Sequence, residues 1–292
     1  MRKAKLFVLH VTVMMSPVYT ENMEGFERAG YIAKKTKKQL SKIITPNVSL
    51  LKIAEFIESQ ASPAFPCNLC LNNVVSFYTP NKCEKTSIKE NDLLKIDFGF
   101  KVHNCPVDTA ITVSFTHHEL IDACKEALDK ALEIIKPNVE VREISAKIQE
   151  VIENYGFKTF EGIHGHSISK GTLHSFLDIP NVRNESREKI KKGQILAIEV
   201  FASEGKGKLT AINEARIYKF IKPVEKSTLF DKYRYYPFTE RWINNLEREE
   251  VVRYIKLGKL YPYPILVEKS GTRVAQFEET IIVTRRGHRI LT

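Results

Sequence analysis

Cysteine is scarce in this 292-residue chain, and its distribution argues against a disulfide framework. The five residues, Cys67, Cys70, Cys83, Cys105 and Cys124, are an odd number without a recognisable spacing pattern. That usage is typical of a reducing compartment. Cys67 and Cys70 form a single CxxC pair, and the missing second pair disfavours a zinc or redox role. We therefore expect a cytoplasmic protein.

Long apolar runs are also missing. The run from Leu6 to Met15 follows a basic start and resembles a weak secretory signal, but it contains His10 and no clear A-x-A site follows it. It is too short to cross a membrane. The other interpretation is that residues 1–22 are an N-terminal extension or a mis-assigned start, with the true start at Met23. We favour this second interpretation and expect no membrane association.

The composition is ordinary for a soluble globular protein, with 43% hydrophobic and 27% charged residues. The length allows one large domain or two small ones. The net charge of +10 and the lysine clusters at 34–38 and 189–192 would allow contact with RNA or the ribosome. No RNA-binding motif accompanies the clusters, so a solvated lysine-rich surface is the simpler interpretation.

An internal repeat relates residues 43–58 to residues 134–149. Seven identical residues recur at a constant offset of 91, beginning with Ile43 and Ile134. Each copy links a lysine-rich helix, expected over 26–42 and 119–135, to a second amphipathic helix through a Pro-Asn-Val turn. The repeat predicts two related α+β halves about a pseudo-twofold axis, with a site at the seam. Coincidence in a common helix-hairpin pattern is the alternative.

Residues 95–113, KIDFGFKVHNCPVDTAITV, alternate between apolar and polar side chains like a β-hairpin. A turn centred between Val102 and His103 would place Asp97 directly opposite Asp108, with Cβ atoms roughly 5 Å apart. Two such carboxylates need a shared proton, a lysine or a metal cation. A different register, with one aspartate solvated, is the alternative.

Further candidate ligands occur later in the chain. His164, His166 and His174 lie close together in a glycine-containing stretch, and Glu199 and Glu278 each interrupt an apolar strand. A carboxylate in such a strand is costly unless it is paired. Four carboxylates and one imidazole suit a dinuclear centre of Mn, Fe, Co or Zn. Such a centre could activate water at neutral pH.

Several long stretches together resemble a known family. They are AFPCNLCLNN, YTPN, the hairpin above, GHSISKGTLHSFLDIPNV, ILAIEVFAS followed by GKG, and AQFEETIIV. From about Met23 to Thr292 the chain resembles type 2 methionine aminopeptidases, the archaeal and eukaryotic kind, in the pita-bread (creatinase/aminopeptidase) fold. The resemblance implies one catalytic domain over 23–292 with a helical insertion at about 208–270, including a helix near 239–255.

The resemblance also implies residue roles. Two divalent metal ions would be held by Asp97, Asp108, His166, Glu199 and Glu278. Asp108 and Glu278 would bridge the ions, and Glu199 would also serve as general base. His174 would contact the scissile peptide. Phe65 and Leu173 would form walls of the methionine side-chain pocket.

Two positions depart from the family pattern. Phe77 stands where the family carries a histidine thought to contact the substrate amide nitrogen. Since general acid–base assistance contributes typically about 10²- to 10⁴-fold, we expect slower turnover, or another group such as His164 in that role. Glu279 stands where relatives often have histidine. It alternates to the face opposite Glu278, so we expect little effect.

The preferred hypothesis is an aminopeptidase that removes the initiator methionine from nascent peptides and prefers small second residues. We expect a cytoplasmic monomer, and a ribosome contact is left open. The alternative is a non-catalytic homologue that binds RNA or the ribosome, which loss of metal ligands would indicate. A prolidase-like enzyme is disfavoured because only about 22 residues precede the first helix of the repeat.

Overall fold

The computed structural model describes the backbone of residues 17–292 and the side chains from residue 22 onward. The predicted extension over residues 1–22 therefore lies mostly outside the described residues, although the first helix already begins at Pro17. Within the described part of the chain, no helix has both the length and the apolar character that a membrane span requires.

Six α-helices and fourteen strands follow one another along the described chain. The helices are α1 (Pro17–Ile43), α2 (Leu50–Glu58), α3 (Glu119–Ile134), α4 (Val141–Asn154), α5 (Thr228–Tyr233) and α6 (Asn245–Lys256), with one 3-10 turn, η1 (Glu240–Trp242). The strands are β1 (Asn68–Leu71), β2 (Val74–Ser76), β3 (Leu94–Phe98), β4 (Lys101–Val102), β5 (Cys105–Pro106), β6 (Thr109–Val113), β7 (His164–Ile168), β8 (Asp178–Pro180), β9 (Ile195–Ser203), β10 (Leu209–Phe220), β11 (Phe238–Thr239), β12 (Leu260–Glu268), β13 (Val274–Val283) and β14 (His288–Ile290). The helices predicted over 26–42 and 119–135 are confirmed as α1 and α3.

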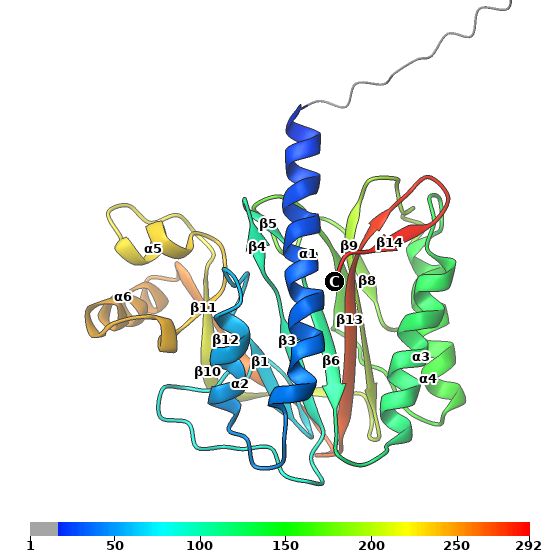
Figure 1. Cartoon of the computed structure of the whole chain (residues 1–292), viewed down its shortest axis with the longest axis horizontal. Helices are drawn as coiled ribbons and strands as arrows, with labels where there is room; N and C mark the ends of the chain where they lie inside the picture. Colours follow the sequence, from blue (N-terminus) through cyan, green and yellow to red (C-terminus); the bar gives the residue numbers. More distant parts are fainter. Residues whose placement is uncertain (1–16) are drawn as a thin grey trace, which may run out of the picture.

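A large antiparallel sheet forms the centre of the molecule, with strand order β1-β3-β6-β13-β9-β7-β8 and β14 paired to β13. Helices α1 to α4 lie together on one face of this sheet (Figure 1). Alternate strand residues such as Leu94 and Ile96 are fully buried among the helices. The residues that alternate with these along β3, among them Asp97, project from the opposite face of the sheet.

The sequence repeat is visible in the backbone. Asn47 and Asn138, the counterparts in the two Pro-Asn-Val turns, both have a positive φ (69° and 76°). Asparagine tolerates this left-handed conformation better than most residues. The Asn47 N–H donates to the Ile88 carbonyl and the Asn138 N–H to the Ile190 carbonyl, both at 2.8 Å. Equivalent turns therefore bring equivalent helix pairs onto the two halves of one sheet.

The predicted hairpin exists, but its register is wrong by two residues. Asp97 pairs with Ala110 rather than with Asp108. The turn centres between His103 and Asn104, which both have positive φ (50° and 61°). A tight two-residue hairpin turn requires that conformation at both central positions, and the predicted Val102 is a β-branched residue that resists it. Because a shift of two residues preserves the face, Asp97 and Asp108 still lie on the same side of the sheet.

The segment over 208–270, expected to be a helical insertion, contains α5 and α6 but also two long paired strands, β10 and β12. With β2 and β11 these strands form a second sheet of order β11-β10-β12-β2. Figure 1 shows α5 and α6 in a lobe beside this sheet, and Phe220 and Leu260 are buried in the lobe's own core. Ile217 and Tyr263, on the other face of the second sheet, line a cavity that Asp97 also borders. That this segment is an insertion stays a prediction.

Candidate metal centre

Four carboxylates meet on the face of the central sheet that the helices leave free. Asp97 comes from β3, Asp108 immediately precedes β6, and Glu199 and Glu278 are paired residues of β9 and β13. Asp97, Asp108 and Glu278 each offer an oxygen that lies within 4.8 Å of the other two. Those three residues are buried, with 8%, 5% and 1% of their surface exposed. Four acids far apart in the sequence are therefore brought together.

His166 completes the group from β7, which pairs with β9. Its Nε2 lies 3.6 Å from Asp108 Oδ2 and 4.0 Å from Glu278 Oε1. Its Nδ1 lies 3.4 Å from the Ser167 carbonyl oxygen. A proton on Nδ1 can be donated to that carbonyl, which leaves the Nε2 lone pair directed at the carboxylates.

His174 is the second imidazole of the site. It follows β7 in the loop that leads to β8, and its ring meets that of His166 edge to face with 3.9 Å between centroids. Asp108, His166 and His174 each contribute an atom to a second group that lies within 4.8 Å. His174 is more exposed than His166, so it lies toward the open side of the site.

The electrostatics of this cluster are unfavourable without a cation. Burial, reinforced by the neighbouring carboxylates, raises the pKa of Asp97, Glu199 and Glu278 well above the ordinary values. Burial also raises the pKa of Asp108 to about 7 and lowers the pKa of His166 to about 4. The imidazole is therefore neutral at physiological pH and does not balance the carboxylates.

The donor set fits divalent metal ions. Asp97 Oδ1, Asp108 Oδ1 and Glu278 Oε1 are buried and have no hydrogen-bond partner among the described residues. Such oxygens are costly unless something compensates them. Lys95 is buried two residues before Asp97, but its ammonium donates to two backbone carbonyls, each at 2.9 Å. Carboxylate oxygens with one neutral imidazole are the ligands that Mn, Fe, Co and Zn accept.

Two amide side chains orient these carboxylates and were not singled out from the sequence. Asn68 Nδ2 donates to Asp97 Oδ2 at 3.2 Å, and Gln276 Nε2 donates to Glu199 Oε1 at 2.9 Å. Asn68 is the cross-strand partner of Asp97 on β1. Gln276 precedes Glu278 by two residues and so shares its face. Alternation along β13 could have identified Gln276, but the pairing of Asn68 required the sheet order.

A cavity of about 270 Å³ opens beside the carboxylates. Phe65 and Leu173, the residues expected to hold a methionine side chain, both line it, and with Ala64 they form a small buried apolar cluster. Asp97, Asp108, Glu199, His166 and His174 line the same cavity. Every residue predicted for the site except Glu278, which lies behind the other carboxylates, therefore borders one space.

Phe77 and His164 border this cavity as well. Phe77 directly follows β2, has a φ of 66°, and packs its ring 4.8 Å from that of Tyr263. A positive φ is unusual for so bulky a residue and costs about 1–2 kcal/mol. His164 shares a strand face with His166, and among the described residues its ring has no hydrogen-bond or ion-pair partner.

Glu279 lies on the opposite face, as predicted. Its carboxylate accepts a hydrogen bond from Lys37 on α1 at 2.7 Å and another from the Thr292 hydroxyl at 2.7 Å. Lys37 belongs to the lysine cluster interpreted as a solvated surface, and for this residue the interpretation is wrong. Its ammonium is turned inward because it pairs with the acid on β13.

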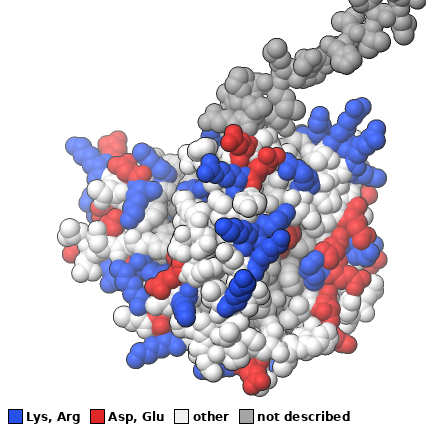
Figure 2. Space-filling model, in the orientation of Figure 1, with Lys and Arg blue, Asp and Glu red and all other residues white. Residues whose placement is uncertain are grey.

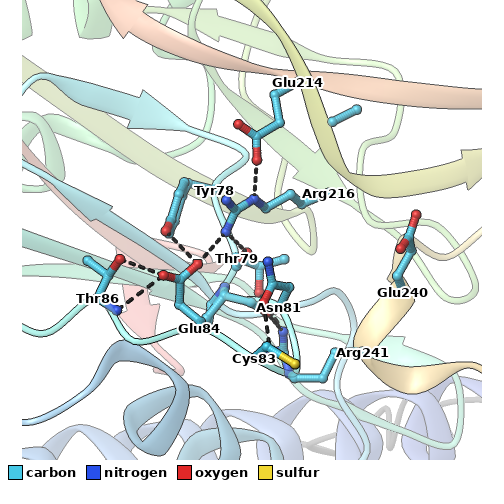
Figure 3. A network of polar contacts seen from close by, with 12 residues as sticks. Tyr78, Thr79, Asn81, Cys83, Glu84, Thr86, Glu214, Arg216, Glu240 and Arg241 are labelled. Atoms are coloured by element: carbon cyan, nitrogen blue, oxygen red, sulfur yellow. Dashed lines mark hydrogen bonds and ion pairs between the residues drawn. The ribbon is translucent and has the colours of Figure 1, made fainter.

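The loop that follows Phe77 is attached to the second sheet through a polar network (Figure 3). Arg216 on β10 donates to Glu84 at 2.8 Å and lies over the Tyr78 ring at 4.4 Å. The Tyr78 hydroxyl donates to Glu84 at 3.0 Å. Although burial opposes ionisation of Glu84, hydrogen bonds from Thr86 and Arg216 lower its pKa to about 2. The network holds the backbone next to Phe77.

Comparisons with known proteins agree with this geometry. The model for "Metallopeptidase family M24" matches residues 24–285. A methionine aminopeptidase of Methanocaldococcus jannaschii is 37% identical over 291 residues, covering 92% of this chain and 99% of that protein.

Two solved structures share the fold at low identity. A thermophilic Arx1 superimposes with a TM-score of 0.80 at 16% identity, over 93% of this chain and 90% of its own. The methionine aminopeptidase of Thermotoga maritima gives 0.71 at 22% identity, over 96% and 98%. At these sequence identities the structural similarity is evidence for the fold alone, and it confirms the pita-bread fold expected from the sequence.

Proposed function

The chain belongs to metallopeptidase family M24 and is a metallo-aminopeptidase; from that premise we propose that it removes the N-terminal methionine from nascent peptides. The observation that carries the proposal is the group of buried carboxylates with unsatisfied oxygens beside an apolar cavity. A charged reaction centre next to an apolar side-chain pocket suits a substrate with an apolar first residue.

Five residues would hold two divalent ions, whose identity we expect to be Co, Mn, Fe or Zn: Asp97, Asp108, His166, Glu199 and Glu278. When bound, the ions would supply the positive charge that polarises the scissile carbonyl and acidifies water. Side chains of the protein would transfer the protons. Gln276 holds one oxygen of Glu199 (2.9 Å), which leaves the other oxygen to accept a proton as general base.

The cavity's other residues would position the peptide. Phe65 and Leu173 would contact the methionine side chain, and both are almost fully buried, at 6% exposure each. His174, in edge-to-face contact with His166, would donate an N–H to the oxygen on which negative charge develops. Such a donor contributes to rate only if it is held in place before the reaction, and the ring contact with His166 provides that constraint.

Phe77 makes the proposed reaction slower than it would be with an imidazole. Its ring cannot transfer a proton, and its contact with Tyr263 keeps it against the cavity wall. His164 is the candidate for a replacement because it borders the same cavity and has no partner among the described residues.

A binding function for RNA or the ribosome is the second candidate. Figure 2 shows basic side chains grouped over α1, where Lys34, Lys35 and Lys38 are exposed. Such a surface could neutralise phosphates. The complete set of buried carboxylates argues against a purely non-catalytic role, because unpaired buried charge is expensive to retain. Contact with the ribosome therefore stays a prediction alongside the catalytic one.

The test is hydrolysis of Met-Ala-Ser peptides by the purified protein with Mn²⁺, Co²⁺ or Fe²⁺. We expect cleavage by the wild type, faster cleavage by Phe77→His, and loss of activity in Glu199→Gln. Glu204→Gln, an exposed acid beyond the end of β9, is the matched control and should remain active. Metal binding without cleavage by wild type and Phe77→His would refute the catalytic proposal in favour of the binding function.

A further inference from the structure

The cavity-facing side of the second sheet continues beyond the cavity. On β10 and β12, Ile217 pairs with Tyr263 and Lys219 pairs with Tyr261. Opposed residues share a face, and residues two apart on a strand share it too. Ile217 and Tyr263 line the cavity. Lys219 and Tyr261 are therefore the next row of the same surface.

This row lies at the mouth of the cavity. Tyr261 is 45% exposed, and its ring meets the Tyr263 ring edge to face at 5.1 Å, so aromatic surface runs continuously from the cavity outward. Pro237, which directly precedes β11 at the other edge of β10, also lines the cavity.

Lys219, which is half-buried, differs from the other lysines of the described chain whose pKa burial lowers. Burial lowers the pKa of four lysines, and three of them donate to oxygen: Lys37 to Glu279, Lys95 to two carbonyls, and Lys101 to the Pro63 carbonyl. The Lys219 ammonium has no hydrogen-bond or ion-pair partner among the described residues. Burial is the single cause of its lowered pKa. A partly desolvated ammonium without a partner is stabilised when an anion pairs with it.

We propose that Lys219 and Tyr261 form a subsite that binds a substrate carboxylate beyond the scissile bond. The inference rests on the proposed aminopeptidase function. A peptide whose first residue occupies the pocket must leave through the mouth, where each extended residue advances about 3.3–3.6 Å. The ammonium would pair with the carboxylate, and the Tyr261 ring would cover the carbon atoms that carry it.

The carboxylate could belong to an acidic side chain at the third residue or to the terminus of a tripeptide. Met-Ala-Asp-amide and Met-Ala-Asn-amide differ in charge and hardly in shape, so their comparison tests the side chain. Met-Ala-Asn as free acid against its amide tests the terminus. We expect at least one of the two charged peptides to show about five- to tenfold higher kcat/KM than its neutral partner.

Variants then assign the effect to Lys219. Lys219→Met should bring the ratio of kcat/KM between the charged and the neutral peptide close to one. Lys219→Glu should reverse the charge preference, so that Met-Ala-Lys-amide becomes the better substrate. Lys222→Met removes the same charge from an exposed position just after β10 and should keep the preference. Urea midpoints of the three variants establish that each one is folded.

Equilibrium binding of the same peptides to the metal-loaded protein separates this inference from the proposed function. Without any hydrolysis, a charged-over-neutral preference in Kd that Lys219→Met removes would still support the subsite, although the aminopeptidase proposal would fail. Equal kcat/KM within both charged and neutral pairs where the peptides are cleaved, or equal Kd within both pairs where they are not, would overturn the subsite. A preference that survives Lys219→Met would overturn it as well.

Discussion

Replacing Asp108 with asparagine is expected to change stability in opposite directions with and without metal. Asp108 is 5% exposed, and its Oδ1 has no partner among the described residues. Burial raises its pKa from 3.8 to about 7. Each pKa unit corresponds to about 1.4 kcal/mol, so its ionisation at pH 8 costs the metal-free folded protein about 4 kcal/mol. An asparagine amide would recover roughly half of this, because it too is incompletely hydrogen-bonded there.

The sign of this effect depends on pH. Between the unfolded value near 4 and the folded value of about 7, the folded protein binds the proton more tightly. The free energy of unfolding of the metal-free wild type should therefore fall as pH rises through that window. Asp108→Asn should be more stable than wild type by about 2 kcal/mol at pH 8; the difference should vanish roughly midway through that window, and wild type should be the more stable protein near pH 4.

Bound metal should make the wild type more stable than Asp108→Asn. At 100 times the Kd, bound metal stabilises the wild type by about 2.7 kcal/mol, whereas the variant lacks a ligand and should gain less. Urea unfolding in chelator and in Mn²⁺ measures both effects. Asp129→Asn on the exposed surface of α3 is the matched control and should leave both values unchanged. Equal metal-free stabilities at pH 8, or equal stabilisation of both proteins by Mn²⁺, would refute the reasoning.

Three further predictions concern the rest of the structure. Arg241→Met leaves Glu58 without its buried ion-pair partner, so the free energy of unfolding should fall by about 3 kcal/mol in urea titrations; a change below 1 kcal/mol would contradict this. Leu173→Ala should raise KM for methionyl peptides about tenfold with kcat nearly unchanged, since it removes contact with the side chain; a loss in kcat alone would place Leu173 outside the pocket. Asn138→Ala should cost about 1 kcal/mol because of the positive φ, whereas Asn138→Gly should be nearly neutral; equal losses would point to the side chain instead.

The sequence was most informative where one local rule was enough. Alternation alone put Asp97 and Asp108 on one face and Glu279 away from Glu278, and both statements hold in the structure. The exact partner of Asp97 could not be obtained this way. It depends on which two residues adopt left-handed conformations in the turn, and several neighbouring residues in that turn are polar enough to be candidates.

Contacts between distant segments were not predictable from local patterns. Asn68 reaches Asp97 because β1 lies beside β3, and Arg216 reaches Glu84 because the second sheet folds back over the loop after β2. Lys37 looked like part of a solvated cluster because it lies in a run of lysines. Its pairing with Glu279 depends on how α1 crosses β13, which neither segment encodes by itself.

The pseudo-twofold relation explains why the site can be acidic without being symmetric. Asp97 on β3 pairs with Ala110, and Glu199 on β9 pairs with Glu278, so these two strand pairs correspond to each other under the pseudo-twofold relation. Ala110 and Glu278 then occupy equivalent positions and are themselves opposed between β6 and β13. Two residues before Ala110 and Glu278, Asp108 and Gln276 likewise occupy equivalent positions.

Each half therefore supplies two carboxylates, but their placement differs. Glu278 lies directly opposite Glu199, whereas Asp108 lies two residues before the partner of Asp97. Had both halves kept an acid at every equivalent position, six carboxylates would share the site. Ala110 and Gln276 reduce the number to four, and four negative charges would balance the two divalent cations proposed here. Gln276 also donates to Glu199, which an acid in its place could not do when ionised. The asymmetry thus sets the charge of the centre and orients one carboxylate for proton transfer, while the duplicated backbone keeps both halves in register.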